Sequence, residues 1–194
     1  MERIERKNLV EELSVVLLRK LKIDKTDTIY YLKCKLGLEF FLVNFYKLVI
    51  IYIVAWILNI IFPVFVFHFF FLFIRGNAQG AHASSDFKCA ILSLVLLVGV
   101  PWLNSIGFLF SEKLLFVLFL LGFIITYLYA PSDSKKNPIY NKTKRKKLRK
   151  KALIAQGVVT LNFIIPLTLL SMNLIVLGAF TASVLLLPKL HEAL

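Results

Sequence analysis

The sequence predicts an all-α, polytopic membrane protein with six transmembrane helices and an N-terminal amphipathic surface helix. Of its 194 residues, 59% are hydrophobic, and the mean hydropathy is +0.78, well above that of an ordinary soluble domain. The apolar residues gather in four runs, at residues 40–74, 89–110, 114–130 and 152–187. The net charge is +13, and nearly all Lys and Arg residues lie outside these runs. Such alternation is typical of a chain that crosses a lipid bilayer repeatedly, so the cell membrane is its expected location.

Residues 1–38 are predicted to form a cytoplasmic, helical N-terminal region. Across residues 2–22, apolar side chains recur at helical spacing, namely Leu9, Leu13, Val16, Leu17 and Leu21. A helix of this kind lies in the headgroup layer of the membrane, or it packs on the cytoplasmic ends of a helical bundle. The polar residues 24–27 end it, and Asp27 is a suitable N-cap for a second helix that leads into the first span. The charged first residues leave no apolar segment for a secretory leader.

The first and last apolar runs are too long for a single crossing. Residues 40–74 would extend roughly 52 Å as one α-helix, whereas the hydrocarbon core is about 30 Å thick. Asn59 and Pro63 predict a turn within the first run, and residues 171–173, after Pro166, predict a turn within the last. The six predicted spans are approximately residues 40–58, 62–75, 89–109, 113–130, 152–170 and 172–188.

The basic residues predict how the spans are oriented. Residues 1–38 and 131–151 carry most of the 24 Lys and Arg residues, and such residues mark the cytoplasmic side. With six spans, every basic segment falls on one side, so both termini are predicted to be cytoplasmic. The chain then forms one membrane domain. After residues 1–38, its parts are a first span pair (39–75), a catalytic cytoplasmic loop (76–88), a second span pair (89–130), a basic cytoplasmic loop (131–151), and a third span pair with the C-terminus (152–194).

The polar stretch at residues 75–89 has the composition of a catalytic site. It places His82 seven residues before Cys89, and a thiol with a neighbouring imidazole is the usual arrangement of a cysteine nucleophile and its base. In one continuous helix the two would lie about 10.5 Å apart along the axis, too far for the roughly 3 Å contact that proton transfer needs. Activity therefore requires a break, which Gly80 permits, followed by a helix that begins near residues 84–86.

The surroundings of Cys89 favour a reactive thiolate. Its predicted position near a helix N-terminus, with Arg75 and Lys88 nearby in sequence, favours the thiolate. Asp86 is spaced to orient His82 on a helix, although its charge, three residues before Cys89, opposes ionisation of the thiol. These residues predict a membrane-surface cysteine enzyme and leave the role of Asp86 open. A solvated loop histidine and a small packing cysteine remain the alternative interpretation.

Other functional classes are disfavoured. Cys34 has no nearby histidine and is expected only to pack, and His68 is expected to bond to a neighbouring helix. One His and one Cys do not supply the three or four ligands of a metal site, so neither a metal nor a cofactor is expected. The basic run 142–151 lacks interleaved aromatic residues, which argues against nucleic-acid binding. Contact with anionic membrane lipids is the simplest explanation of this run.

Three motifs resemble one known family. They are Arg75 with Gly80-Ala81-His82-Ala83 and Cys89, the loop Tyr129–Ile139, and the weaker pair Leu36–Glu39 and Asn44–Lys47. Together with the six-span layout they make the chain similar, over nearly its whole length, to the accessory gene regulator B (AgrB) family. This family comprises membrane cysteine endopeptidases of Gram-positive quorum-sensing systems.

The resemblance implies a reaction and a substrate. Cys89 would be the nucleophile and His82 its general base, acting on a short AgrD-type precursor peptide. Cys89 would cleave off the charged C-terminal tail, and an internal Cys or Ser of the peptide would attack the resulting thioester to close a macrocycle. Gln79 stands where many members have glycine, so the oxyanion donors are unassigned, and no family-wide acid corresponds to Asp86. The family leans to homodimers, although the sequence leaves the oligomeric state open.

Two further expectations concern the substrate and a rival function. Lys135 and Lys136 lie on the same predicted side as the catalytic loop and are expected to hold an acidic precursor tail. The rival is a small peptide or lipid transporter, or a scaffold without peptidase activity. A transporter needs polar groups along a mid-membrane path, and the spans offer few, chiefly Asn44, Lys47, His68, Asn104, Gln156 and Asn162. The sequence does not reveal the cut site, the exporter, or whether the ring is a thiolactone or a lactone.

Overall fold

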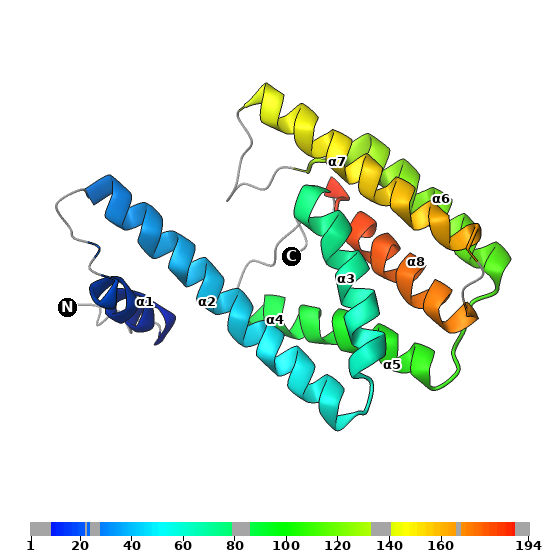
Figure 1. Cartoon of the computed structure of the whole chain (residues 1–194), viewed down its shortest axis with the longest axis horizontal. Helices are drawn as coiled ribbons and strands as arrows, with labels where there is room; N and C mark the ends of the chain where they lie inside the picture. Colours follow the sequence, from blue (N-terminus) through cyan, green and yellow to red (C-terminus); the bar gives the residue numbers. More distant parts are fainter. Residues whose placement is uncertain are drawn as a thin grey trace. The chain divides into compact units, whose positions relative to one another are not determined.

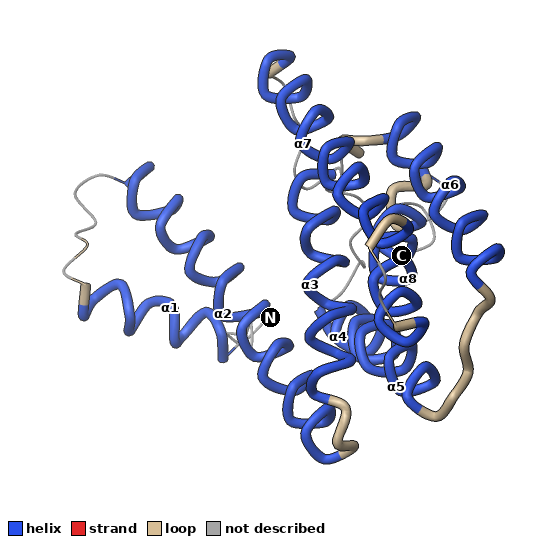
Figure 2. Tube along the Cα trace, turned by 45° about the vertical axis from the view of Figure 1, so that its right-hand side comes forward, coloured by secondary structure: helices blue, strands red, loops and turns tan. Residues whose placement is uncertain are grey.

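A computed structural model describes residues 9–21, 23, 28–78, 86–132, 141–165 and 168–188. All regular elements of these residues are helices (Figure 2), which confirms the all-α prediction. The chain divides into two compact units, residues 1–50 and residues 51–194.

The first unit contains α1 (Leu9–Lys20) and the greater part of α2 (Thr28–Ile57). The predicted N-terminal helix is thus confirmed over residues 9–20. Ser14 on α1 is fully buried, and its hydroxyl donates to Glu39 Oε1 on α2 at 3.3 Å. Lys35 Nζ on α2 lies 2.6 Å from Glu11 Oε1 on α1 and 3.6 Å from Glu39 Oε1. Charged and hydroxyl groups therefore join the two helices.

The second unit contains the end of α2 and all later elements. They are α3 (Ile61–Ala78), α4 (Asp86–Leu94), the π-helix η1 (Val95–Gly99), α5 (Val100–Ser105), α6 (Glu112–Tyr129), α7 (Lys142–Thr160), the 3-10 helix η2 (Leu161–Phe163) and α8 (Leu169–Val184). The central helix is α8, which packs chiefly against α3 and α6 (Figure 1). Its residues 172–179 are all buried.

The contact between α3 and α8 is unusually close at Gly178. A Cβ atom at this position would lie 2.6 Å from the backbone carbonyl oxygen of Phe67 on α3. Only glycine allows the two backbones to approach so closely, as small residues do at helix contacts in membranes. Gly178 therefore fixes the position of α3 against the central helix.

The third predicted span consists of α4, η1 and α5, which follow one another without interruption from Asp86 to Ser105. The π-helical turn immediately precedes Pro101, whose ring nitrogen has no hydrogen to donate to the carbonyl of Leu97 one turn earlier. The proline thus accounts for a local change of helical hydrogen bonding in this span.

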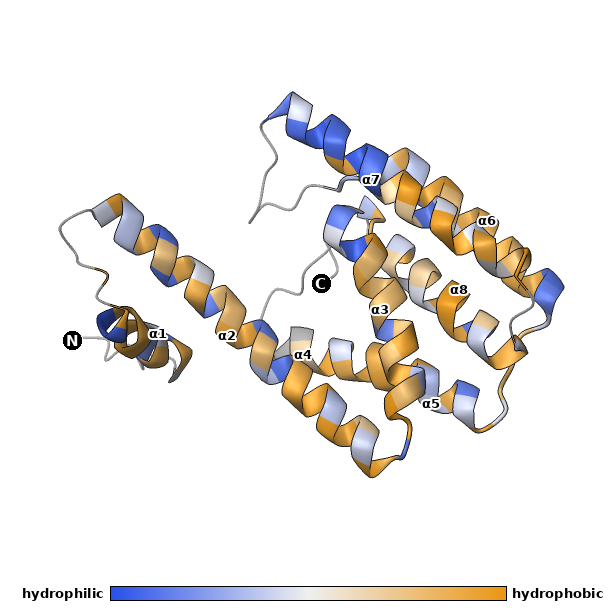
Figure 3. Ribbon diagram, viewed as in Figure 1, coloured by the Kyte–Doolittle hydropathy of each residue, from blue (hydrophilic) through white to orange (hydrophobic). Residues whose placement is uncertain are grey.

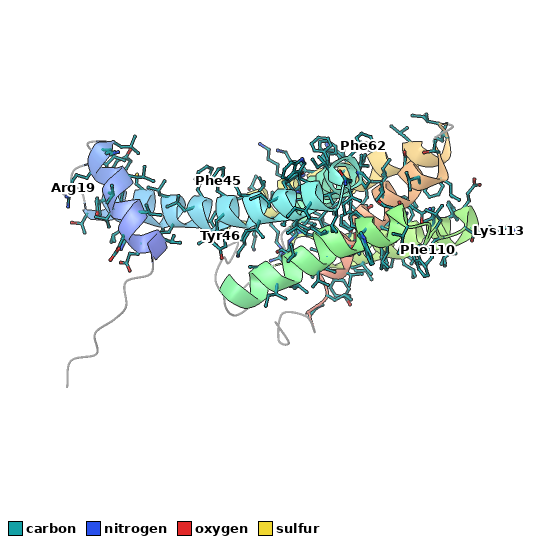
Figure 4. All side chains as sticks on the ribbon, turned by 90° about the horizontal axis from the view of Figure 1, so that it is seen from below. Arg19, Phe45, Tyr46, Phe62, Phe110 and Lys113 are labelled. Carbon is teal, nitrogen blue, oxygen red and sulfur yellow. The ribbon has the colours of Figure 1, made fainter. Side chains whose placement is uncertain are left out.

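The second unit exposes many large apolar side chains and buries several polar ones, which is unusual in a soluble protein. Large apolar side chains face outward, including Phe62 (labelled in Figure 4), which is 68% exposed. Polar side chains lie inside, among them Asn104, Thr126, Gln156, Asn173 and Ser183. Lipid is the medium in which this arrangement is favourable. By length and composition α2, α3 and α6 are able to cross a membrane, and residues 90–105 and 169–184 form shorter apolar helices. The count of six spans stays a prediction.

One of the two predicted turns is confirmed and the other is wrong. The chain turns at Asn59, whose φ of 56° lies in the left-handed region that asparagine tolerates. Residues 171–173 do not form the last turn, because they lie inside α8. The chain leaves α7 earlier, through η2, and Thr168 begins α8 by accepting a hydrogen bond from the Ser171 amide. Asn173 instead accepts from the amide of Phe110 at 2.9 Å.

Candidate active site

The predicted catalytic loop lies between α3 and α4. Arg75 is in the last turn of α3, and the backbone of Asp86 and Cys89 belongs to the start of α4. The backbone of Cys89 therefore lies near the N-terminus of α4, as the sequence predicts. His82, Gln79 and Gly80 lie outside the described residues, so the predicted break between His82 and Cys89 stays a prediction.

The second motif of the sequence begins beside this loop. After α6, the amide of Ser132 donates to the carbonyl oxygen of Ala78, the last residue of α3, at 3.0 Å. Ala78 and Ala130 are both buried in the same apolar cluster. The structure therefore brings together the start of the loop that carries His82 and the start of the loop that carries Lys135 and Lys136.

Lys135 and Lys136 themselves lie outside the described residues, but both ends of their loop are placed. At the far end, the side chain of Asn141 caps α7 by accepting from the amides of Thr143 at 2.9 Å and Lys144 at 3.2 Å. The loop thus connects the end of α6, which is hydrogen-bonded to the end of α3, with the basic start of α7.

The first half of α7 is a continuous basic surface, seen as the blue end of that helix in Figure 3. All its Lys and Arg residues from 142 to 151 are exposed. Arg149 joins this surface to the end of α6: its Nη2 donates to the carbonyl of Tyr127 at 2.8 Å, and its guanidinium lies 5.1 Å from the centre of the Tyr127 ring. The basic surface is therefore held beside the segment that leads to Ser132.

This charge does not stabilise the helix that carries it. The first turn of α7 has no acidic residue, and its cations oppose the positive end of the helix dipole. Like charges also recur three and four residues apart, as at Lys142, Arg145 and Lys146, and they repel one another. An anionic partner outside the helix, such as a lipid phosphate or a peptide carboxylate, would relieve this repulsion.

A buried polar cluster, which the sequence alone did not predict, lies between α6, α7 and α8. The amide nitrogen Nε2 of Gln156 donates to Thr126 Oγ1 at 3.0 Å and to Ser183 Oγ at 2.7 Å, and these two hydroxyls lie 3.0 Å apart. Relative exposures are 1% for Gln156 and 0% for both hydroxyl residues. Polar residues within the apolar runs 114–130 and 152–187 were the available signal, but their pairing depends on how the helices are rotated.

Two remaining expectations concern other residues. His68 is buried, and its Nδ1 lies 3.4 Å from the hydroxyl of Tyr52 on α2, which confirms the predicted bond to a neighbouring helix. Cys34 is a half-buried free cysteine on α2. Within the described parts of the chain, no three His, Cys, Asp or Glu side chains are grouped so that they could hold a metal ion.

Several apolar helices, exposed apolar side chains and an interior polar cluster define a helical membrane protein. Comparison with known proteins identifies the family of this membrane protein. The family model "Accessory gene regulator B" matches residues 10–187, so the chain belongs to the AgrB family. Membership of this family implies a peptidase that processes the AgrD precursor peptide in quorum sensing.

The similar curated proteins cover most of the chain. The accessory gene regulator protein B of Staphylococcus lugdunensis is 36% identical over 165 residues, which are 84% of this chain and 85% of the relative. That of Staphylococcus haemolyticus is 32% identical over 181 residues, 93% of each. A putative AgrB-like protein of Clostridium acetobutylicum is 29% identical over 189 residues, 96% of this chain and 90% of the relative. No solved structure matches the chain significantly.

Proposed function

We propose that the chain is a membrane-embedded cysteine endopeptidase that removes the C-terminal tail of an AgrD-like precursor and promotes its closure into a macrocycle. The observation that carries the proposal is the 3.0 Å hydrogen bond from Ser132 to Ala78. It joins the residues at which two segments begin: one segment leads to His82 and Cys89, and the other leads to Lys135 and Lys136. Cys89 and His82 are the catalytic residues, and Arg75, Gln79, Gly80 and Asp86 support their loop.

The reaction proceeds in two acyl transfers. The Cys89 thiolate attacks the carbonyl carbon of the bond that precedes the tail, and a thioester forms as the C–N bond breaks. Protonated His82 gives its proton to the departing amine of the tail. A thiol or hydroxyl within the precursor then attacks the thioester, transfers its proton to His82 and releases Cys89. Cyclisation has only to outcompete water, which a dry membrane site favours.

The proposed topology places this chemistry on the cytoplasmic side. If the chain crosses the membrane six times, residues 76–88, residues 131–151 and both termini share one side, and it is the side with the excess of Lys and Arg. The exposed cations of α7 then lie where both anionic lipids and an acidic peptide tail are accessible. Lys135 and Lys136, between Ser132 and Asn141, are the proposed tail contacts.

The test is to express the chain with its precursor peptide and analyse the peptide by mass spectrometry. Changing Cys89 to Ala should abolish shortening of the precursor while the protein still inserts in the membrane. The control Cys34→Ala, which alters the other thiol, should leave processing intact. Changing Lys135 and Lys136 to Gln together should raise the KM of the full-length precursor, and added salt should produce the same defect in the wild type.

Three outcomes would overturn the proposal or part of it. Normal shortening by the Cys89→Ala protein would exclude Cys89 as the nucleophile, whereas failure of the wild type to shorten the precursor would favour a transporter or scaffold. An unchanged KM in the double lysine variant at low and high salt would restrict these lysines to setting membrane topology.

A further inference from the structure

The cluster of Thr126, Gln156 and Ser183 has one hydrogen-bonding atom left over. Four hydrogens are available in it: two on the Gln156 amide and one on each hydroxyl. Ser183 donates its hydrogen to the carbonyl of Ala179 at 2.9 Å, so Thr126 must be the donor between the two hydroxyls. The Gln156 amide supplies the remaining two hydrogens. Every donor is used, and Gln156 Oε1 has no partner among the described residues.

The orientation of the Gln156 amide follows from the same count of hydrogens. With the amide reversed, both hydroxyls would have to donate to Gln156 Oε1, and the 3.0 Å contact between Thr126 and Ser183 would then lack a hydrogen. The carbonyl of Ala179 would also lose its donor from Ser183. Gln156 therefore presents its oxygen away from the two hydroxyls, as an acceptor in a place that water reaches poorly.

A buried acceptor without a donor is costly, because its lost hydration is not replaced. The structure retains this cost at a defined place. A side chain on a helix leans toward the helix N-terminus, so Gln156 lies over the turn that contains Ala152. Ala152 belongs to the same buried cluster as Ala78 and Ala130, the residues where the two functional loops begin. The hydroxyl of Thr126 accepts from Gln156, and the Thr126 carbonyl accepts from the amide of Ala130 at 2.9 Å. The polar cluster therefore lies one helical turn before Ala130, where the loop that carries Lys135 and Lys136 begins.

We propose that Gln156 Oε1 accepts a hydrogen bond from a backbone N–H of the precursor peptide, and that Thr126 and Ser183 hold it in position. This inference rests on the proposed function, because it adds a substrate-positioning residue to that site. A peptide in extended conformation carries an N–H at each residue, and one of them would satisfy the oxygen when the peptide reaches Cys89. The contact is formed on binding and is retained during the reaction, so it should lower KM rather than raise kcat.

The experiment measures cleavage of a synthetic precursor and of analogues in which each backbone N–H in turn is replaced by an ester oxygen. In the wild type, one ester should raise KM about tenfold, as expected for the loss of one desolvated hydrogen bond. The Gln156→Met variant should show the same increase with the unmodified precursor, an unchanged kcat, and no further increase with that ester. Thr126→Val and Ser183→Ala, which keep the oxygen but loosen it, should raise KM less.

A merely structural role predicts a different result. Gln156→Met would then lower the apparent Tm and the amount of active protein, and every ester would affect both proteins equally. That outcome, or the absence of any sensitive ester in the wild type, would overturn the inference.

If Gln156→Met does not insert stably, Gln156→Glu replaces it, since a buried neutral acid keeps a carbonyl oxygen. It should retain the ester sensitivity of the wild type, and losing that sensitivity would also overturn the inference. Failure of the wild type to shorten the parent precursor would instead refute the proposed function.

Discussion

The contact between α3 and α8 and the contact between α1 and α2 are held by opposite kinds of force. At the first, Gly178 allows the two backbones to meet, and the surrounding residues are apolar and buried. At the second, Lys35 lies between Glu11 and Glu39, with side chains 22%, 41% and 26% exposed. The first contact depends on shape alone. The second depends on charge in a place that salt and lipid headgroups reach.

The two contacts also support different parts of the chain. The α3–α8 contact supports Ala78 at the end of α3, and Ala78 in turn receives the hydrogen bond from Ser132. A shape-determined contact keeps Ala78 in place whatever the ionic conditions. The α1–α2 contact belongs to the other unit, and ionic strength is able to adjust it. The end of the bundle where the two proposed loops begin should therefore be insensitive to salt in its packing and sensitive only in its binding of charged partners.

We expect the largest effect on stability and on activity from Gly178→Ala. The new Cβ would lie 2.6 Å from the carbonyl oxygen of Phe67, a backbone atom that cannot move without moving α3. We expect a destabilisation of about 1–3 kcal/mol, as for overpacking in a core, and loss of most peptidase activity because Ala78 moves with α3. Thermal unfolding in detergent and precursor cleavage measure the two effects.

Gly157→Ala provides the matched control for this variant. Apart from its chain neighbours and the backbone of its own helix, nothing lies within 4 Å of a Cβ built at Gly157, which is within α7. Alanine is favoured over glycine in a helix by about 0.5–1 kcal/mol, so the apparent Tm should rise slightly. If the two alanine variants behave alike, shape does not determine the α3–α8 contact.

A smaller effect, of opposite sign, is expected at Asn104. This side chain on α5 is 1% exposed, and neither of its amide atoms has a hydrogen-bond partner in the described structure. Asn104→Leu removes the unsatisfied groups and keeps a branched side chain, so it should stabilise the bundle by about 1 kcal/mol. Asn173→Leu should do the reverse, because the Asn173 amide bonds to Phe110 and Leu169. A lower apparent Tm for Asn104→Leu would mean that this amide has a partner in the membrane.

The comparison also shows what the sequence was able to predict. The turn near Asn59 and Pro63 follows from residue types that interrupt helices, a property of single residues, and the structure places Asn59 in the left-handed region. Residues 171–173 were assigned to a turn for the same kind of reason and lie in a helix, since Asn173 is paired with Phe110, 63 positions away. The hydrogen bonds of Gln156 likewise join residues 27 and 30 positions apart. Hydropathy places helices along a chain, but it does not determine which faces of two helices meet.

The smallest expected effect is that of Lys35→Met, which removes the charge between Glu11 and Glu39 while keeping an apolar side chain of similar length. Partly exposed ion pairs contribute little to stability, so global unfolding should hardly change. Instead, the amide hydrogens of α1 should exchange with solvent about two- to fivefold faster, because exchange from a peripheral helix reports local opening. Exchange in α8 should be unaffected, and Lys33→Met, at an exposed lysine of the same helix, should leave α1 unchanged.

High salt should bring the exchange rate of α1 in the wild type toward that of Lys35→Met, since it screens the same charges. Equal exchange in α1 of the wild type and of Lys35→Met at low salt would mean that burial of Ser14 and Leu18, which are 0% and 1% exposed, holds α1 against α2 without help from charge.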